Sequence, residues 1–351
     1  MKEINNAGGI LGQDVKLLIR DSQTDPDKAA STASDMIDGE GVPAIIGAAS
    51  SGVSQKVLET TQARSVVLIS GSSTSPFFTD VADSGFFFRT VPSDALQGKV
   101  MAKKARNLGY DTASVLYVNN AYGSPLTAVF EASFEEAGGT VLESVSFDKE
   151  QGSYAPQLSQ VFPADSTQWP DVVILIAYPG SGGTIISEYV LGGFETAWIL
   201  GDGLKSPNFI TNAGAANVNG MIGTGPYTGG PNYEAFVAAY GVEFGEDPRT
   251  HIYAESYYDA MMLLALAIEK AGEATGPAIR DALKSVSGPS GEVVNVGQFA
   301  NGVAELAAGR DINYEGAAGP VDFDEVGDVI ADYEVWKIEG GQIVHVETIR
   351  P

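Results

Sequence analysis

The chain has 351 residues and a formal net charge of −25 at pH 7, from 45 acidic and 20 basic residues. With 44% hydrophobic and 19% charged residues it can bury a core, which excludes disorder as its main state, and its length suggests about two domains. A surface with this much negative charge repels phosphate backbones and anionic lipid. We therefore expect no nucleic-acid partner.

Apolar runs alternate with helical stretches through the first two thirds of the chain. The predicted strands and short apolar runs are residues 15–20, 43–47, 66–70, 86–89, 113–118, 141–147, 172–177 and 198–200. The predicted helices between them are residues 25–37, 51–63, 94–108, 122–137 and 182–191. Strands that are apolar on both faces and separated by helices form parallel sheets covered by helices. This order predicts a doubly wound α/β architecture.

The pattern changes beyond Gly220. A strand is predicted at residues 221–225, helices at 233–244, 251–271 and 277–286, and a hairpin from residues 332–337 and 343–348 around Glu339-Gly340-Gly341. Residues 1–6, followed by Ala7-Gly8-Gly9, are typical of the last turn of a helix and its glycine stop. Because a parallel sheet rarely begins with a helix end, we expect a first strand and most of a first helix to lie outside this sequence.

Polar residues follow the predicted strands directly, where ligands bind in open α/β sheets. They are Ser50, Ser51, Ser70, Ser72, Ser73, Thr74, Tyr122, Tyr178 and Asp202. Hydroxyls and helix N-termini suit a carboxylate, an aspartate suits an ammonium, and tyrosines supply apolar walls with a polar tip. The set predicts a site for a small zwitterion.

Each of these residues also has a structural interpretation. Ser51 is an expected helix cap, the serine loop at residues 71–76 (GSSTSP) fits turn chemistry, and Asp202 between two glycines fits a turn. Tyr122 and Tyr178 fit ordinary helix starts. Taken singly, each residue is better explained by structure, and only their joint occurrence at successive strand ends favours a ligand site.

Enzyme motifs are incomplete. Residues 48–52 (AASSG) approximate a nucleophile elbow at Ser50, but neither His251 nor His345 lies where a catalytic base belongs. Residues 180–183 (GSGG) begin like a dinucleotide fingerprint, but Ile185 stands where its third glycine is needed. The sequence contains no phosphate-binding loop motif. The histidines lack local metal-ligand spacing, the chain has no cysteine, and no apolar run reaches the roughly 18 residues that span a bilayer. We expect no enzyme, cofactor, metal site or membrane insertion.

Several segments resemble the type I periplasmic binding proteins, and more narrowly their leucine/isoleucine/valine-binding branch, which serves ABC transporters. They are residues 4–30, 43–52, 66–76 (VVLISGSSTSP), 86–98 and 115–123 (VLYVNNAYG). The resemblance implies two Rossmann-like lobes joined by a three-strand hinge. Lobe 1 is expected at residues 1–91 with 227–330, and lobe 2 at 92–226 with 331–351.

The resemblance also implies roles for single residues. Ser51 and Thr74 match positions that hold the ligand carboxylate, with Ser72 contributing backbone groups, and Ser73 belongs to the same loop. Asp202 matches the acid that holds the ammonium, although the branch often has a longer glutamate there. Tyr122 and Tyr178 match tyrosines that face the ligand side chain.

The implied function is amino-acid capture by hinge closure outside the cytoplasm. The expected partners are a branched-chain or similar apolar amino acid and the membrane permease of an ABC transporter. The expected location is periplasmic or extracellular, with lipid anchoring through a segment outside this sequence as an option. The alternatives are an effector-sensing domain for signalling or transcription and, more remotely, a serine hydrolase at Ser50.

Overall fold

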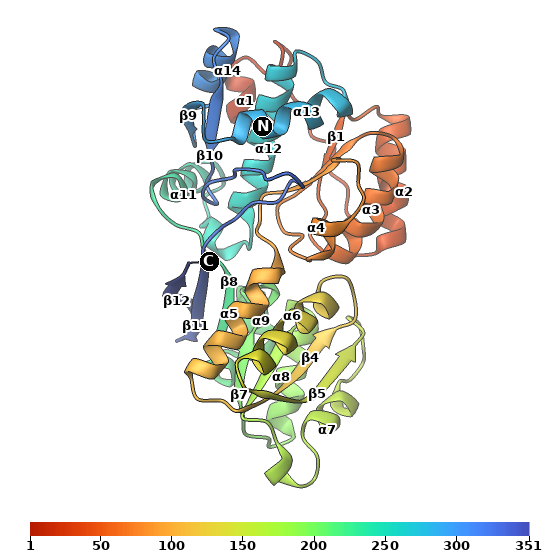
Figure 1. Cartoon of the computed structure of the whole chain (residues 1–351), viewed down its shortest axis with the longest axis vertical. Coiled ribbons are helices and arrows are strands. Elements are labelled where there is room, and N and C mark those ends of the chain that lie inside the picture. Colours follow the sequence, from red (N-terminus) through yellow and green to blue (C-terminus); the bar gives the residue numbers. More distant parts are fainter. Residues whose placement is uncertain (351) are drawn as a thin grey trace. The chain divides into compact units, whose positions relative to one another are not determined.

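The structure is a computed structural model that describes residues 1–350 (Figure 1). The chain divides into two compact units, and it crosses between them three times. Unit 1 comprises Met1–Ser93 and Thr228–Ala331, and unit 2 comprises Asp94–Tyr227 and Asp332–Pro351.

Unit 1 contains a three-stranded parallel sheet of order β1-β2-β3 and a two-stranded parallel pair, β9 and β10. Its strands are β1 (Ala44–Ile46), β2 (Val67–Ser70), β3 (Phe87–Arg89), β9 (Glu292–Asn295) and β10 (Ile312–Glu315). Its helices are α1 (Lys2–Asn6), α2 (Pro26–Ser34), the π-helical turn η1 (Asp35–Gly39), α3 (Ser51–Ala63), α4 (Phe77–Asp80), α11 (Pro231–Phe244), the 3-10 turn η4 (Pro248–Thr250), α12 (Ala254–Ala271), α13 (Gly276–Ser287) and α14 (Phe299–Ala307).

Helices cover both faces of the three-stranded sheet. Val67 and Ile69 point into a core shared with α12 and α13, whereas Leu68 and Phe87 point into a second core shared with α2 and α3. This alternation follows from the two-residue period of a strand. Because both faces are buried, β2 is apolar along its length up to Ser70, where the chain leaves the sheet.

Unit 2 is built on a seven-stranded sheet of order β12-β11-β8-β7-β6-β4-β5. Its strands are β4 (Thr112–Val118), β5 (Thr140–Phe147), β6 (Val172–Ile176), β7 (Ala197–Leu200), β8 (Ile222–Pro226), β11 (Tyr333–Glu339) and β12 (Gln342–Ile349). Its helices are α5 (Asp94–Asn107), α6 (Gly123–Glu136), α7 (Ala155–Val161), η2 (Ser166–Gln168), α8 (Pro179–Leu191), η3 (Asp202–Leu204), α9 (Pro207–Ala213) and α10 (Ala215–Val218).

The strands of unit 2 pair as their burial predicts. β5, β4, β6, β7 and β8 run parallel, and the fully buried β6 is the central one of these five strands. β11 and β12 form the predicted antiparallel hairpin, in which Glu339 pairs with Gln342 across a two-residue turn. That turn consists of Gly340 and Gly341, whose φ angles of 59° and 77° suit glycine. The hairpin and the doubly wound α/β class are confirmed.

The predicted strand at residues 15–20 is wrong. These residues form neither helix nor strand, and Ile19 is 81% exposed. Among the described residues β1 pairs only with β2, and no strand pairs with residues 15–20. The backbone of Val15 instead bonds the side chain of Asn5. An apolar run alone does not make a strand without a partner.

Other predicted bounds hold with small shifts. α2 begins after the predicted cap Asp25, whose carboxylate accepts from the amides of Asp27 and Lys28. The helix predicted from His251 begins at Ala254, because His251 follows the 3-10 turn η4. The pair β9 and β10 and the intervening α14 were missed, since β9 is half exposed and too short to show a period. Across residues 1–350, no helix has both the length and the apolar character needed to span a bilayer.

Candidate functional site

In unit 1 the predicted carboxylate-binding residues gather where β1 and β2 end. Ser50 caps the 13-residue helix α3 in an extended conformation, and Ser51 is its first residue. The amide of Ser75 donates to Ser51 Oγ at 3.4 Å, which joins this helix start to the serine loop, residues 71–76. Ser51 is 2% and Thr74 1% exposed. A helix N-terminus beside hydroxyl groups favours an anion.

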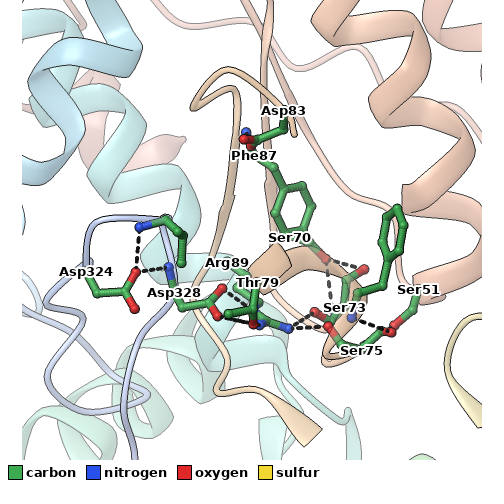
Figure 2. Close-up of polar contacts among 12 residues, drawn as sticks. Ser51, Ser70, Ser73, Ser75, Thr79, Asp83, Phe87, Arg89, Asp324 and Asp328 are labelled. Atoms are coloured by element: carbon green, nitrogen blue, oxygen red, sulfur yellow. Dashed lines mark hydrogen bonds and ion pairs between the residues drawn. The ribbon is translucent and has the colours of Figure 1, made fainter. Parts of the chain in front are cut away.

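Ser73 belongs to an internal network rather than to the surface of the loop. Its Oγ lies 2.9 Å from Ser70 Oγ (Figure 2). It also lies 2.7 Å from Ser54 Oγ, and all three side chains are fully buried. Ser54, Ser70 and Ser73 also bond the carbonyl of Ala48. These contacts explain Ser73 by structure: it fastens the serine loop to the end of β1.

Ser72 points to a different neighbour, which the sequence did not reveal. Its Oγ donates to the carbonyl of Ala49 at 2.9 Å and lies 2.7 Å from the hydroxyl of Tyr257 on α12. Burial raises the pKa of Tyr257, so its phenol stays a neutral donor. The same ring packs on Gly71, where an added Cβ would lie 2.8 Å from the ring. Tyr257 thereby holds the start of the serine loop.

In unit 2 the predicted ammonium-binding residue Asp202 follows β7 and is 3% exposed. Its Oδ1 accepts from the hydroxyl of Tyr122 at 2.6 Å and from Gln97 Nε2 at 3.1 Å. Burial, followed by the negative charges of Asp202 and Asp94, raises the pKa of Tyr122 well above its ordinary value. The phenol therefore remains protonated and donates to the carboxylate.

Tyr122 and Tyr178 form an aromatic pair at the ends of β4 and β6. Their rings stack with centroids 5.7 Å apart and planes inclined by 24°. Asn120 orders both residues, because its Nδ2 donates to the Tyr178 hydroxyl at 3.1 Å and its Oδ1 accepts from the amides of Tyr122 and Gly123. The structure thus brings together Tyr122, Tyr178 and Asp202 in unit 2.

Further polar groups near Asp202 were missed. Asp94 and Gln97, on the first turn of α5, are fully buried, and Gln97 Nε2 also donates to the carbonyl of Thr224. Gln97 Oε1, Thr224 Oγ1 and Trp336 Nε1 are buried and make no hydrogen bond within the described chain. A buried polar atom without a partner is costly, and it suits contact with a polar ligand or water. The sequence signal that could have indicated Asp94 and Gln97 is the polar first turn of a helix that begins soon after β3.

The two histidines serve no common site. His251 faces Glu246 in unit 1, at 3.4 Å, and His345 Nδ1 lies 2.7 Å from Glu334 in unit 2. No group of three or more metal-ligating side chains occurs within residues 1–350.

A family model described as "Periplasmic binding protein" matches residues 1–342. The chain belongs to this family. This periplasmic binding protein is also 30% identical to the chemotactic signal transduction system substrate-binding protein BasB of Halobacterium salinarum, over 100% of this chain and 83% of that protein. It is 25% identical to the leucine-, isoleucine-, valine-, threonine-, and alanine-binding protein of Pseudomonas aeruginosa, over 81% of this chain and 75% of that one.

The solved structures place it in the same branch. The leucine-binding protein LivK of Thermotoga maritima superposes with a TM-score of 0.83 and 26% identity, over 100% of this chain and 93% of that one. The resemblance to the Leu/Ile/Val-binding branch and its fold is confirmed. These relatives are solute-binding proteins and not enzymes, which removes the hydrolase alternative at Ser50. The family is periplasmic or extracellular.

Proposed function

We propose that this protein captures an α-amino acid with an apolar side chain and presents it to the permease of an ABC transporter. The observation that carries the proposal is the buried Asp202 carboxylate, which Tyr122 and Gln97 orient beside a stacked tyrosine pair. An ammonium group matches the charge of this carboxylate, and an aliphatic side chain matches the tyrosine faces. The leucine-binding relatives support the same ligand class by their names.

The carboxylate of the amino acid is assigned to unit 1. The start of α3 carries Ser51, and the serine loop carries Thr74 beside it. Hydroxyls and the positive end of a 13-residue helix together favour a carboxylate over a neutral group. Ser72 contributes through its backbone, since its hydroxyl already bonds Ala49 and Tyr257.

We propose capture by hinge closure because the two charged groups of the ligand are assigned to different units. If the carboxylate binds unit 1 and the ammonium binds unit 2, a conformation that satisfies both sets at once has contacts that an open one lacks. Only such a difference in affinity shifts a conformational equilibrium. Small-angle scattering tests this step: leucine should reduce the radius of gyration of the protein, and an unchanged radius at saturation would contradict it.

Calorimetric titration with leucine, isoleucine, valine and 4-methylpentanoate, which lacks the ammonium, tests the site. We expect the wild type to bind at least one of the amino acids and to reject 4-methylpentanoate. Asp202→Asn should weaken amino-acid binding by about 100-fold, because a buried charge pair loses one partner. It should also narrow the preference for leucine over 4-methylpentanoate.

Asp165→Asn is the matched control, since it removes an exposed carboxylate of the same unit. We expect the control to keep wild-type affinity. Failure of every amino acid to bind, or an unchanged affinity in Asp202→Asn, would overturn the proposal.

A second candidate is delivery of the bound amino acid to a chemotaxis receptor. It is favoured by the 30% identity to BasB over 100% of this chain, because that relative is named as part of a chemotactic system. Deleting the gene in the source organism separates the two roles. Loss of labelled amino-acid uptake supports transport, whereas loss of attraction with uptake intact supports chemotaxis.

Lipid anchoring through a segment outside this sequence stays a prediction. It is tested by detergent phase partitioning of the protein isolated from its own cells. An anchored protein enters the detergent phase, and recovery entirely in the aqueous phase would contradict anchoring.

A further inference from the structure

Arg89 ends β3 and is fully buried inside unit 1, where all five of its N–H groups donate hydrogen bonds (Figure 2). Nε and Nη2 donate to the two oxygens of Asp328, both at 2.6 Å. Nη2 also donates to Thr79 Oγ1 at 2.8 Å. Nη1 donates to two backbone carbonyls of the serine loop, those of Ser73 at 3.2 Å and Ser75 at 2.8 Å.

The two carbonyls lie on either side of Thr74, the residue assigned to the ligand carboxylate. In a trans peptide the N–H points opposite to the preceding carbonyl. Because Arg89 holds the carbonyl of Ser73, the amide of Thr74 is directed away from the guanidinium. Backbone N–H groups aimed in this way are the usual recognition elements for a carboxylate.

We propose that Arg89 is the positioning residue of the carboxylate site, and that it sets the backbone of residues 73–75 without touching the ligand. The proposal rests on the proposed function, because it deepens the assignment of Thr74. The charge of Arg89 is paired with that of Asp328, so the proposed role is geometric.

The surroundings hold Arg89 in one orientation. Asp328 binds it as a two-point fork, and Thr79 donates to Asp328 Oδ2 at 2.6 Å while accepting from Arg89. The amide of Arg89 donates to the carbonyl of Gly327, and an added Cβ on Gly327 would lie 2.5 Å from the carbonyl of Phe87. The loop at residues 324–328 is therefore pressed against β3, and the guanidinium has little freedom to turn.

Lysine cannot replace this arrangement. Its ammonium has three N–H groups on a point charge, so it can pair with Asp328 but cannot also reach both loop carbonyls with fork geometry. Arg89→Lys thus keeps the buried charge pair and releases the loop. A milder variant, Thr79→Val, removes one acceptor of Nη2 and one donor to Asp328, which loosens the orientation of the guanidinium and so weakens the Nη1 contacts with the loop.

Two measurements on the full chain test the proposal, each on Arg89→Lys, Thr79→Val and a control. The first is amide hydrogen exchange of residues 71–75 without ligand, and the second is leucine affinity by calorimetry. The control is Asp259→Asn, which disturbs another buried carboxylate of unit 1, bonded to Tyr314, Ala317 and Ala318 rather than to the serine loop.

We expect Arg89→Lys to speed amide exchange in the serine loop at least 10-fold and to weaken leucine binding at least 10-fold. Thr79→Val should speed the same exchange about threefold and weaken leucine binding about threefold. Asp259→Asn should leave both within twofold, although it lowers stability. If Arg89→Lys does not fold, the loop exchange and the leucine affinity of Thr79→Val test the positioning role in its place. Unchanged loop exchange and affinity in a folded variant would overturn the positioning role. If the wild type binds no amino acid, the proposed function fails, and loop exchange alone still decides the role of Arg89.

Discussion

Tyr122, the residue before α6, donates a 2.6 Å hydrogen bond to Asp202, the first residue of the 3-10 turn η3 after β7. The contact joins the ends of two strands that are not neighbours in the sheet, since β6 lies between β4 and β7. The hydroxyl of Tyr122 also accepts from the amide of Gly203 at 3.3 Å. One phenol therefore sets the direction of the carboxylate and of the backbone beside it.

Tyr122→Phe should weaken leucine binding about 10-fold, because a hydrogen bond to a buried charge is worth about 1.5–3 kcal/mol. Calorimetric titration checks this expectation. Tyr178→Phe is the matched control: it removes a hydroxyl that accepts from Asn120 and keeps the stacked ring. It should change the affinity less than threefold, and equal losses in the two variants would argue against a special role for the Tyr122–Asp202 contact.

Gly223→Ala should destabilise the protein by about 1–3 kcal/mol, because overpacking a filled core forces side chains to move. A Cβ on Gly223 would lie 2.2 Å from the indole ring of Trp336, which is fully buried across the strand pair β8 and β11. Gly225→Ala, on the same strand, meets its nearest atom only at 3.4 Å and should cost less. Urea unfolding measures both, and a larger loss in Gly225→Ala would contradict the packing argument.

Asp259 makes the stability of the protein depend on pH. Burial raises its pKa to about 7, against the opposing effect of hydrogen bonds from Ala318, Ala317 and Tyr314. A folded pKa above the ordinary value of 3.8 means that the folded state holds the proton more tightly. This contribution is complete below about pH 4 and is lost as the pH rises towards 7, by at most ~1.4 kcal/mol per pH unit.

The stability difference between the wild type and Asp259→Asn isolates this group from the other carboxylates. We expect the advantage of the wild type, measured by urea unfolding, to shrink between pH 5 and pH 7.5. An advantage that stays constant or grows over that interval would show that Asp259 is charged in the folded protein throughout.

Added salt should raise the melting temperature by several degrees. The chain carries 45 acidic and 20 basic residues, so repulsion among like charges opposes the folded state. At 1 M salt the Debye length falls to about 3 Å, which screens that repulsion. Calorimetry in 0.1 M and 1 M KCl tests this, with equal osmolality of sucrose as the control. A melting temperature that falls with KCl would mean that the surface ion pairs outweigh the repulsion.

Much of the fold could be read from periodic and local signals. Apolar runs such as β2 and β6 are buried on both faces, and the hairpin carries its two glycines at the turn. These patterns depend on neighbours within a few residues. The same reasoning failed for residues 15–20, where the apolar run is present but no strand pairs with it.

The sequence by itself determined the α/β class, the family and the polar residues at the strand ends, because backbone period and strand direction bring those residues to one edge of a sheet. Only the tertiary structure decided what each side chain does there. It turned Ser73 inward to Ser54, joined Tyr122 to Asp202, and set Arg89 against a loop reached from Asp328, 239 positions along the chain. Such contacts depend on side-chain direction and on segments distant in sequence, which no local pattern encodes.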